Sequence, residues 1–102
     1  MKLRFGTKDR TTQVLETDSY NQLFEYIRNY LLYDLKIPKH NIFTRIVGVS
    51  PTKTIIDFGS HSLFFFVNVG TKTLNELYWK ENSTEKVYYQ SRKKKERLED
   101  NQ

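Results

Sequence analysis

The segment Leu63–Val69, with the sequence LFFFVNV, constrains the fold more than any other part of the chain. It is the most apolar stretch, yet it is far shorter than the roughly 20 residues that a helix needs to cross a bilayer. Successive large apolar side chains in a strand point to both faces of a sheet. The segment therefore predicts a central strand, with one face covered by a helix and the other by a different element or by the second copy in a homodimer.

The residues before this strand predict the rest of an antiparallel meander. Arg45–Val49 and Thr54–Phe58 are rich in β-branched side chains, which favour strands. Proline at the second position of Ser50–Lys53 and glycine at the start of Gly59–Ser62 are typical of turns. Three consecutive strands joined by short turns are the expected arrangement.

The N-terminus predicts a β-hairpin. Apolar Met1, Leu3 and Phe5 alternate with Lys2, Arg4 and Gly6, so one face of this strand is apolar and the other basic. A turn at Arg10–Thr12 would lead into a second short strand at Gln13–Glu16.

The residues after Asp18 predict one long amphipathic helix packed on the sheet. Ser19 and Gln22 have the S-x-x-Q spacing of a capping box. Apolar side chains then recur at steps of three and four residues, at Tyr20, Leu23, Phe24, Ile27, Leu31 and Leu35. Asp34 falls on this apolar face near the negative end of the helix dipole, so the helix should end there, and Pro38 opposes continuation.

Residues 73–90 have two interpretations. Thr73 and Glu76 have the spacing of a second capping box, which favours a short helix ending near Glu81. The alternative is a hairpin with arms at Glu76–Lys80 and Lys86–Gln90. Residues 91–102 contain one large apolar side chain and cannot pack a core, so they should form a solvated helical extension or a disordered tail. The sequence thus predicts a single α+β domain over residues 1–90 and a basic tail over residues 91–102.

Composition narrows the class of protein. The chain has no cysteine, which excludes disulfides and thiolate zinc sites and favours a cytoplasmic protein. It also has no alanine and is rich in lysine, asparagine, isoleucine, tyrosine and phenylalanine, as AT-rich genes often encode. We therefore expect a low-GC bacterium, or a phage or plasmid of one, as its origin. Two histidines and the absence of a glycine-rich phosphate loop predict no metal, no cofactor and no enzymatic activity.

Charge is the first signal for binding. The formal net charge is +5, and five cations lie within six positions of the tail, at Arg92, Lys93, Lys94, Lys95 and Arg97. Such a density can neutralise several phosphates, although a solubilising tail is the alternative interpretation. Lys2 and Arg4 on the basic face of the first strand are a second, smaller cationic element.

Aromatic residues are the second signal. If Leu63, Phe65 and Val67 face the helix, then Phe64 and Phe66 face the opposite side of the sheet, beside Lys2 and Arg4. Aromatic rings flanked by cations on a sheet are typical of surfaces on which bases stack. The alternative is that the C-terminal segment covers both rings.

Tyrosine and tryptophan suggest a different surface. Tyr26, Tyr30 and Tyr33 share a flank of the predicted helix, either as boundary residues packed on the sheet, which we favour, or as a protein contact. Trp79 lies off the apolar face of the second helix, as an anchor for a partner or a lid on the sheet.

These signals lead to three function hypotheses. The first is a small non-enzymatic nucleic-acid-binding protein that uses Lys2, Arg4, Phe64, Phe66 and the tail. The second is an inhibitor or adaptor from a mobile element, of the anti-CRISPR or anti-defence type, that binds a host protein or nucleoprotein through Tyr26, Tyr30, Tyr33 and Trp79. The third and weakest is a small ribonuclease using His61 or His40. None of the three involves a membrane.

Overall fold

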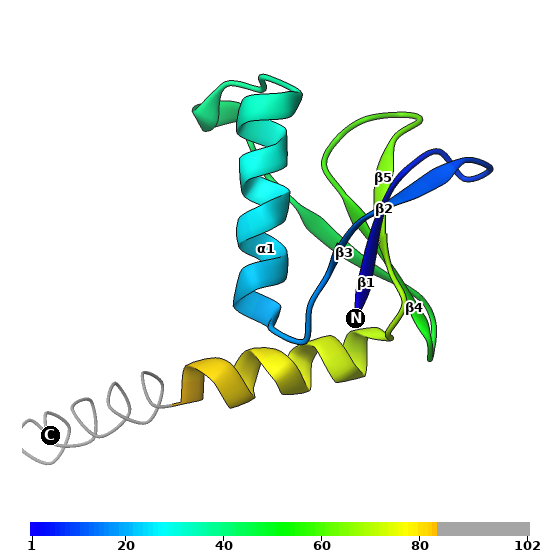
Figure 1. The fold of residues 1–102 in the computed structure, drawn as a ribbon, viewed down its shortest axis with the longest axis vertical. Helices are drawn as coiled ribbons and strands as arrows, with labels where there is room; N and C mark the ends of the chain where they lie inside the picture. Colours follow the sequence, from blue (N-terminus) through cyan, green and yellow to red (C-terminus); the bar gives the residue numbers. More distant parts are fainter. Residues whose placement is uncertain (84–102) are drawn as a thin grey trace, which may run out of the picture.

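The computed structural model describes residues 1–83. The chain forms two strands, a helix, three further strands and a second helix (Figure 1). The elements are β1 (Lys2–Gly6), β2 (Thr11–Glu16), α1 (Tyr20–Asn29), a π-helical turn (Tyr30–Asp34), a 3₁₀ turn (Lys39–Asn41), β3 (Arg45–Ser50), β4 (Lys53–Asp57), β5 (Phe64–Val67) and a helix from residue 71 to residue 83, where the description ends.

The five strands form one antiparallel sheet in the order β2-β1-β5-β4-β3. The predicted N-terminal hairpin and the three-stranded meander are both confirmed, and together they make an α+β fold. β5 lies at the centre of the sheet because it pairs with β1 on one side and with β4 on the other. The central position predicted for the phenylalanine-rich strand is therefore confirmed.

The first helix is shorter than predicted. α1 spans 10 residues, and the five residues that follow form a π-helical turn in which the Leu35 N–H donates to the Tyr30 carbonyl over 3.0 Å. The expectation of one long helix is thus not confirmed, although the helical path does end at Asp34 as the sequence predicts. Leu23, Ile27 and Leu31 are fully buried and form the stripe that packs on the sheet.

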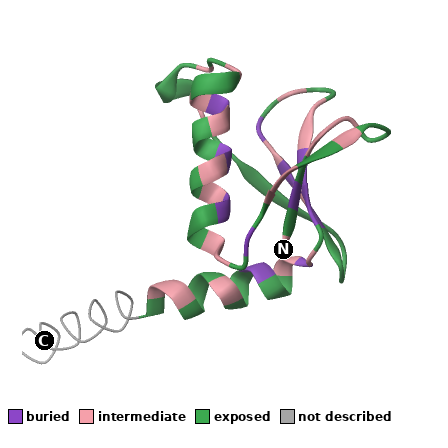
Figure 2. Cartoon of the chain, in the orientation of Figure 1, coloured by how far each residue is buried: buried purple, intermediate pink, exposed green. Residues whose placement is uncertain are grey.

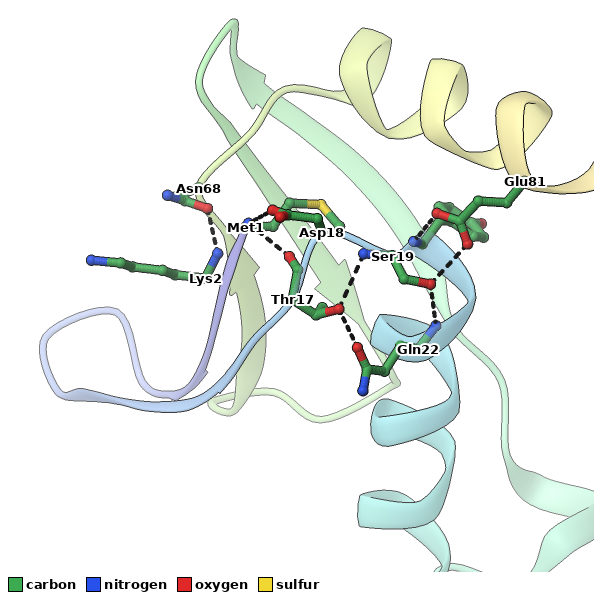
Figure 3. A network of polar contacts seen from close by, with 9 residues as sticks. Met1, Lys2, Thr17, Asp18, Ser19, Gln22, Asn68 and Glu81 are labelled. Carbon is green, nitrogen blue, oxygen red and sulfur yellow. Dashed lines mark hydrogen bonds and ion pairs between the residues drawn. The ribbon is translucent and has the colours of Figure 1, made fainter.

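The capping box at the start of α1 forms only in part. The Ser19 hydroxyl oxygen accepts from the Gln22 N–H over 3.1 Å, as predicted. The Gln22 side chain does not bond back to the Ser19 N–H. Instead, that N–H donates to the Thr17 hydroxyl oxygen over 3.1 Å, and the Thr17 hydroxyl donates to Gln22 Oε1. Thr17 therefore completes the cap (Figure 3).

The C-terminal helix is confirmed, and the alternative hairpin is wrong, because residues 76–80 are helical. The helix begins at residue 71 rather than at the predicted Thr73 cap, with the Leu74 N–H donating to the Gly70 carbonyl over 3.1 Å. Only glycine fits at position 70, since a Cβ there would lie 2.5 Å from the Pro51 carbonyl oxygen. This close approach to the β3–β4 turn sets where the helix starts.

The two helices meet at the start of α1, where the helix of residues 71–83 runs across its end (Figure 1). The carboxylate of Glu81 accepts from the Ser19 hydroxyl over 2.8 Å (Figure 3). It also accepts from the Tyr20 N–H over 2.5 Å and from the Asn21 N–H over 3.1 Å. α1 has no acidic residue in its own first turn. Glu81 therefore supplies the negative charge that stabilises the positive end of a helix dipole.

One core cluster lies between α1 and the sheet. Its fully buried members include Leu3, Ile56 and Phe65 from the strands, together with the buried stripe of α1. Leu74 of the C-terminal helix belongs to the same cluster and is 1% exposed. Figure 2 shows the buried positions of α1 on its sheet-facing side. Burial of each such side chain stabilises the fold by about 2 kcal/mol.

Two expectations concern residues that are not described. The boundary at residue 90 and the tail of residues 91–102 lie outside residues 1–83 and stay predictions. Within residues 1–83, no helix is both long enough and apolar enough to cross a membrane.

Candidate nucleic-acid interface

Strand alternation places a mixed basic and aromatic surface on the side of the sheet turned away from α1. Phe5 and Phe65 are cross-strand partners, and both rings lie close to Tyr30 in the π-helical turn that follows α1, with centroids 4.7 and 5.8 Å from its ring. Arg4 and Phe66, the next pair along these strands, therefore point to the opposite side. We call this side the open face; its residues from β1, β4 and β5 include Lys2, Arg4, Lys53, Ile55, Asp57, Phe64 and Phe66.

A hollow of about 390 Å³ lies on the open face. Three cationic side chains line it, and the rest of its lining combines neutral hydrogen-bonding groups with apolar atoms. We call it the basic hollow; it is lined by Arg4, Lys8, Lys53, Thr11, Ser50, Thr52, Asn68, Phe66 and Val67. Because this lining contains cations and hydroxyl groups but no carboxylate, the hollow is chemically suited to a phosphate group.

Among the described residues, no ion pair neutralises the cations of the basic hollow. Within residues 1–83, the ion pairs join the N-terminal amine to Asp18 over 3.4 Å and Arg45 to Asp57 over 2.7 Å. Neither pair involves a residue of the hollow. The positive charge of the hollow therefore faces solvent and can attract an anion.

Asp57 is the acidic residue of β4 on the open face, and its charge is already balanced. The N–H of Gly59 donates to its carboxylate over 2.8 Å, and Arg45 donates to the other oxygen. The Gly59 hydrogen bond, helped by Arg45 and opposed by partial burial, holds the pKa of Asp57 below its ordinary value. Asp57 is thus an ionised, paired group that repels phosphate less than a free carboxylate would.

The two phenylalanines of the open face differ in exposure. Phe66 is 7% exposed, because the Lys53 ammonium lies 4.8 Å from its ring centroid and the Phe64 ring meets it edge-on at 6.1 Å. Phe64 is half-buried and presents more of its surface to solvent. Phe66 lies opposite Arg4 in the β1–β5 pairing and Phe64 lies opposite Gly6, so Phe64 is the more accessible of the two rings. The Lys53 ammonium lies over the Phe66 ring in a cation–π contact.

Lys2 lies next to the basic hollow without lining it. Its backbone N–H donates to Asn68 Oδ1 over 2.6 Å, and the Asn68 N–H donates to the Lys2 carbonyl over 3.3 Å. These bonds extend the pairing of β1 with β5 by one residue and leave the Lys2 side chain exposed on the open face. The remaining cations expected to bind nucleic acid, Arg92, Lys93, Lys94, Lys95 and Arg97, lie outside the described residues.

The three tyrosines of the first helix do not form one surface. Tyr26 and Tyr30 are half-buried, with ring centroids 6.0 Å apart, and both pack against the core. Burial, together with Asp34 and Tyr26, raises the pKa of Tyr30. Tyr33 is 70% exposed and stands apart from them. The boundary role therefore fits Tyr26 and Tyr30, and Tyr33 alone is well exposed for a partner.

Trp79 lies on the C-terminal helix and is 44% exposed. Its ring meets Tyr78 edge-on at 4.8 Å, and Tyr78 in turn meets Tyr20 of α1 at 5.1 Å. This row of rings joins the two helices.

Sequence reasoning missed two cations and one amide of the basic hollow. Lys8 lies in the β1–β2 turn, and Asn68 directly follows β5. Lys53 was expected in a turn, but β4 begins with it, so that it shares a face with Ile55. The alternation of Lys53, Ile55 and Asp57 with buried Thr54 and Ile56 is the signal that could have found it.

The histidines lie in exposed turns. His40 is in the 3₁₀ turn, and His61 is in the β4–β5 connection. Next to His61, the Ser60 hydroxyl oxygen accepts from the N–H groups of Ser62 and Leu63, over 3.3 and 3.1 Å, as in an ordinary turn. Within residues 1–83, no three acidic or histidine side chains are grouped to hold a metal.

Comparison of the chain with protein-family models, with curated proteins and with solved structures found no match in any of the three.

Proposed function

We propose that this protein is a small non-enzymatic nucleic-acid-binding protein and that the open face is its binding surface. The observation that supports this most directly is the basic hollow, where Arg4, Lys8 and Lys53 meet around neutral hydrogen-bonding groups. A backbone phosphate would bind these cations. The half-buried ring of Phe64 lies on the same face, where a neighbouring base can stack on it.

Salt dependence tests the proposal. Fluorescence anisotropy with labelled random-sequence single- and double-stranded DNA and RNA should give dissociation constants of about 1–100 µM at physiological salt and tighter binding at low salt. Binding should weaken steeply as salt rises, because each phosphate contact releases condensed counterions. No binding of any of the four probes at low salt would contradict the proposal.

Two triple variants then test the surface. Arg4→Gln/Lys8→Gln/Lys53→Gln removes the cations of the basic hollow and should lower the slope of log affinity against log salt by about 2–3. Arg28→Gln/Lys36→Gln/Lys39→Gln removes the same charge from exposed positions outside the open face and should leave the slope nearly unchanged. Equal effects of the two variants would show that net charge, and not the open face, determines binding.

Phe64 and the tail make separate contributions. Phe64→Leu keeps an apolar side chain but removes the ring, so it should cost about 1 kcal/mol of binding to a single strand and little to a duplex.

Deletion of residues 91–102 removes five cations and should weaken binding and flatten its salt dependence. Unchanged affinity after the deletion would remove the tail from the proposed interface.

A second candidate function is the inhibitor or adaptor that binds a host protein or nucleoprotein. The observation that favours it is the exposure of large apolar and aromatic side chains outside the open face, among them Tyr33, Phe43 and Trp79 at 70%, 54% and 44%. It becomes the leading hypothesis if none of the four nucleic-acid probes binds.

A further inference from the structure

The α1 side of the sheet is only partly covered. Five strands spaced about 4.8 Å apart place β2 and β3 about 19 Å from each other, whereas one helix is about 10–12 Å wide. The core contacts of α1 reach Leu3 of β1, Phe65 of β5 and Ile56 of β4. In the described chain, no residue of β3 belongs to the core cluster. The sheet therefore has room for a second helix beside α1, over the first half of β3; in the second half, a Cβ at Gly48 would lie 3.3 Å from the Thr71 side chain of the C-terminal helix.

β3 exposes apolar side chains that another element could cover. All six of its residues are exposed (Figure 2). Ile46, which is 39% exposed, pairs with buried Ile56 and therefore lies on the α1 side, whereas Val47 pairs with Ile55 on the open face. The opposite edge of the sheet differs, because the exposed residues of β2 are Thr12, Gln13 and Glu16. Polar residues protect an edge strand from unwanted pairing, and in β3 they lie only at the two ends, at Arg45 and Ser50.

A groove of about 400 Å³ runs between α1 and the chain that leads into β3. Its apolar lining comes from Phe24 and Ile27 of α1 and from Ile42 and Phe43. Arg28 and Lys39 add two cationic side chains to the lining. We call it the edge groove. Phe43 is 54% exposed, and its ring is close enough to Gly59 that a Cβ there would lie 3.1 Å away. The residues named here include no acidic group, and neither ion pair of residues 1–83 involves Arg28 or Lys39.

We propose that the edge groove binds an acidic amphipathic helix of a partner protein, which lies beside α1 over β3. Its apolar residues, spaced as i, i+3 or i+4 and i+7, would enter the groove. Its acidic residues would pair with Arg28 and Lys39. This inference goes beyond the proposed nucleic-acid binding, because it uses the other side of the sheet and a different class of partner.

Charge and chemistry favour this occupant over three others. A second copy of the chain has a net charge of +5, and residues 84–102 hold more basic than acidic residues, so both are electrostatically mismatched to a groove flanked by cations. Nucleic acid has the right charge and could stack on the Phe43 ring, but the lining of the edge groove is mainly apolar, with Thr44 as its one hydroxyl group, whereas phosphates are bound by several polar groups. An acidic, amphipathic protein segment matches both the charge and the apolar lining.

Selection from random peptides tests the proposal directly. A phage-displayed library of random 16-residue peptides is selected on the full chain, and enriched peptides are synthesised with a fluorescent label. We expect net acidic sequences with apolar residues at helical spacing, which gain helical circular dichroism when they bind. No enrichment, or enriched peptides without acidic and apolar patterning, would overturn the proposal.

Variants locate the binding site. Arg28→Glu/Lys39→Glu and, separately, Phe43→Gln should each weaken peptide binding at least tenfold; all three positions are exposed, and circular dichroism will check that the fold is kept. Arg4→Gln/Lys8→Gln/Lys53→Gln, on the open face, controls for a general loss of positive charge; it lowers the net charge by three, against four for the charge-reversed variant, and should leave peptide affinity within twofold. Equal binding by the charge-reversed variant and wild type would overturn the proposal. So would sedimentation of the wild type as a dimer that Phe43→Gln dissociates, because the occupant would then be a second copy.

Discussion

At the scale of single residues, Lys36 is the position where backbone geometry and residue type disagree. It has a φ of 56°, in the left-handed region, directly after the π-helical turn and Leu35. The Ile37 N–H donates to the Leu31 carbonyl over 2.9 Å, which lies one residue further back than the corresponding bond of a Schellman motif because the preceding turn is π-helical. Glycine is the usual residue at this position because a Cβ is disfavoured there.

Lys36→Gly should therefore stabilise the protein by about 0.5–1 kcal/mol, since removal of the left-handed strain outweighs the extra freedom of glycine in the unfolded chain. Urea unfolding measures the change. Lys36→Ala is the control: it removes the same charge but keeps a Cβ, so it should stay within about 0.5 kcal/mol of wild type. A loss of stability in Lys36→Gly would show that the left-handed backbone of Lys36 is not strained.

At the scale of secondary-structure elements, Glu81 joins the two helices. Partial burial would raise the pKa of its carboxyl. The N–H groups of Asn21 and Tyr20 and the Ser19 hydroxyl donate to the ionised form and more than offset that effect, so the folded pKa lies below the ordinary value of 4.5. A lowered folded pKa means that ionised Glu81 stabilises the fold above the unfolded pKa and that this contribution is lost as the pH falls through the folded pKa.

Glu81→Gln should cost about 1 kcal/mol of unfolding free energy at pH 7, a modest value because the carboxylate is partly exposed. The difference from wild type should shrink as the pH falls below 4.5. Urea unfolding of both proteins at pH 7 and at successive lower pH values measures it. Glu76→Gln removes an exposed carboxylate from the same helix and should have little effect. A constant difference at all pH values would contradict the role of the Glu81 charge.

At the scale of the whole molecule, the C-terminal helix is part of the core. Leu74 is 1% exposed and belongs to the cluster between α1 and the sheet, whereas Leu77, one turn later, is half-buried. A small domain has few buried side chains, so each contributes a large share of its stability.

Leu74→Ala should thus destabilise the protein by about 3 kcal/mol, through lost burial and the cavity left behind. Leu77→Ala makes the same chemical change at a half-buried site and should cost about half as much or less. Chemical denaturation of the two variants side by side measures the difference. Equal losses would mean that Leu74 does not anchor the helix in the core.

Much of the fold could be predicted because local patterns specify it. Three such patterns depend only on neighbouring residues and predicted their elements. They are the Ser19 cap, the helical spacing of Leu23, Ile27 and Leu31, and the apolar run that forms β5. Element ends were harder to predict. The π-helical turn after Asn29 and the helix start at residue 71 depend on contacts with distant parts of the chain, such as that of Gly70 with Pro51.

The amino-acid sequence by itself determined which residues could share a face. Alternation in β1 and β5 places Arg4 with Lys2 and Phe64 with Phe66, because the side-chain period of a strand is two whatever surrounds it. Only the tertiary structure decided which faces meet. The pairing of β1 with β5, and of β5 with β4, brought Arg4, Lys8 and Lys53 to one hollow, and the position of α1 over the middle strands left the first half of β3 uncovered. Strand order and helix placement follow from burial of the core as a whole, which no local pattern records.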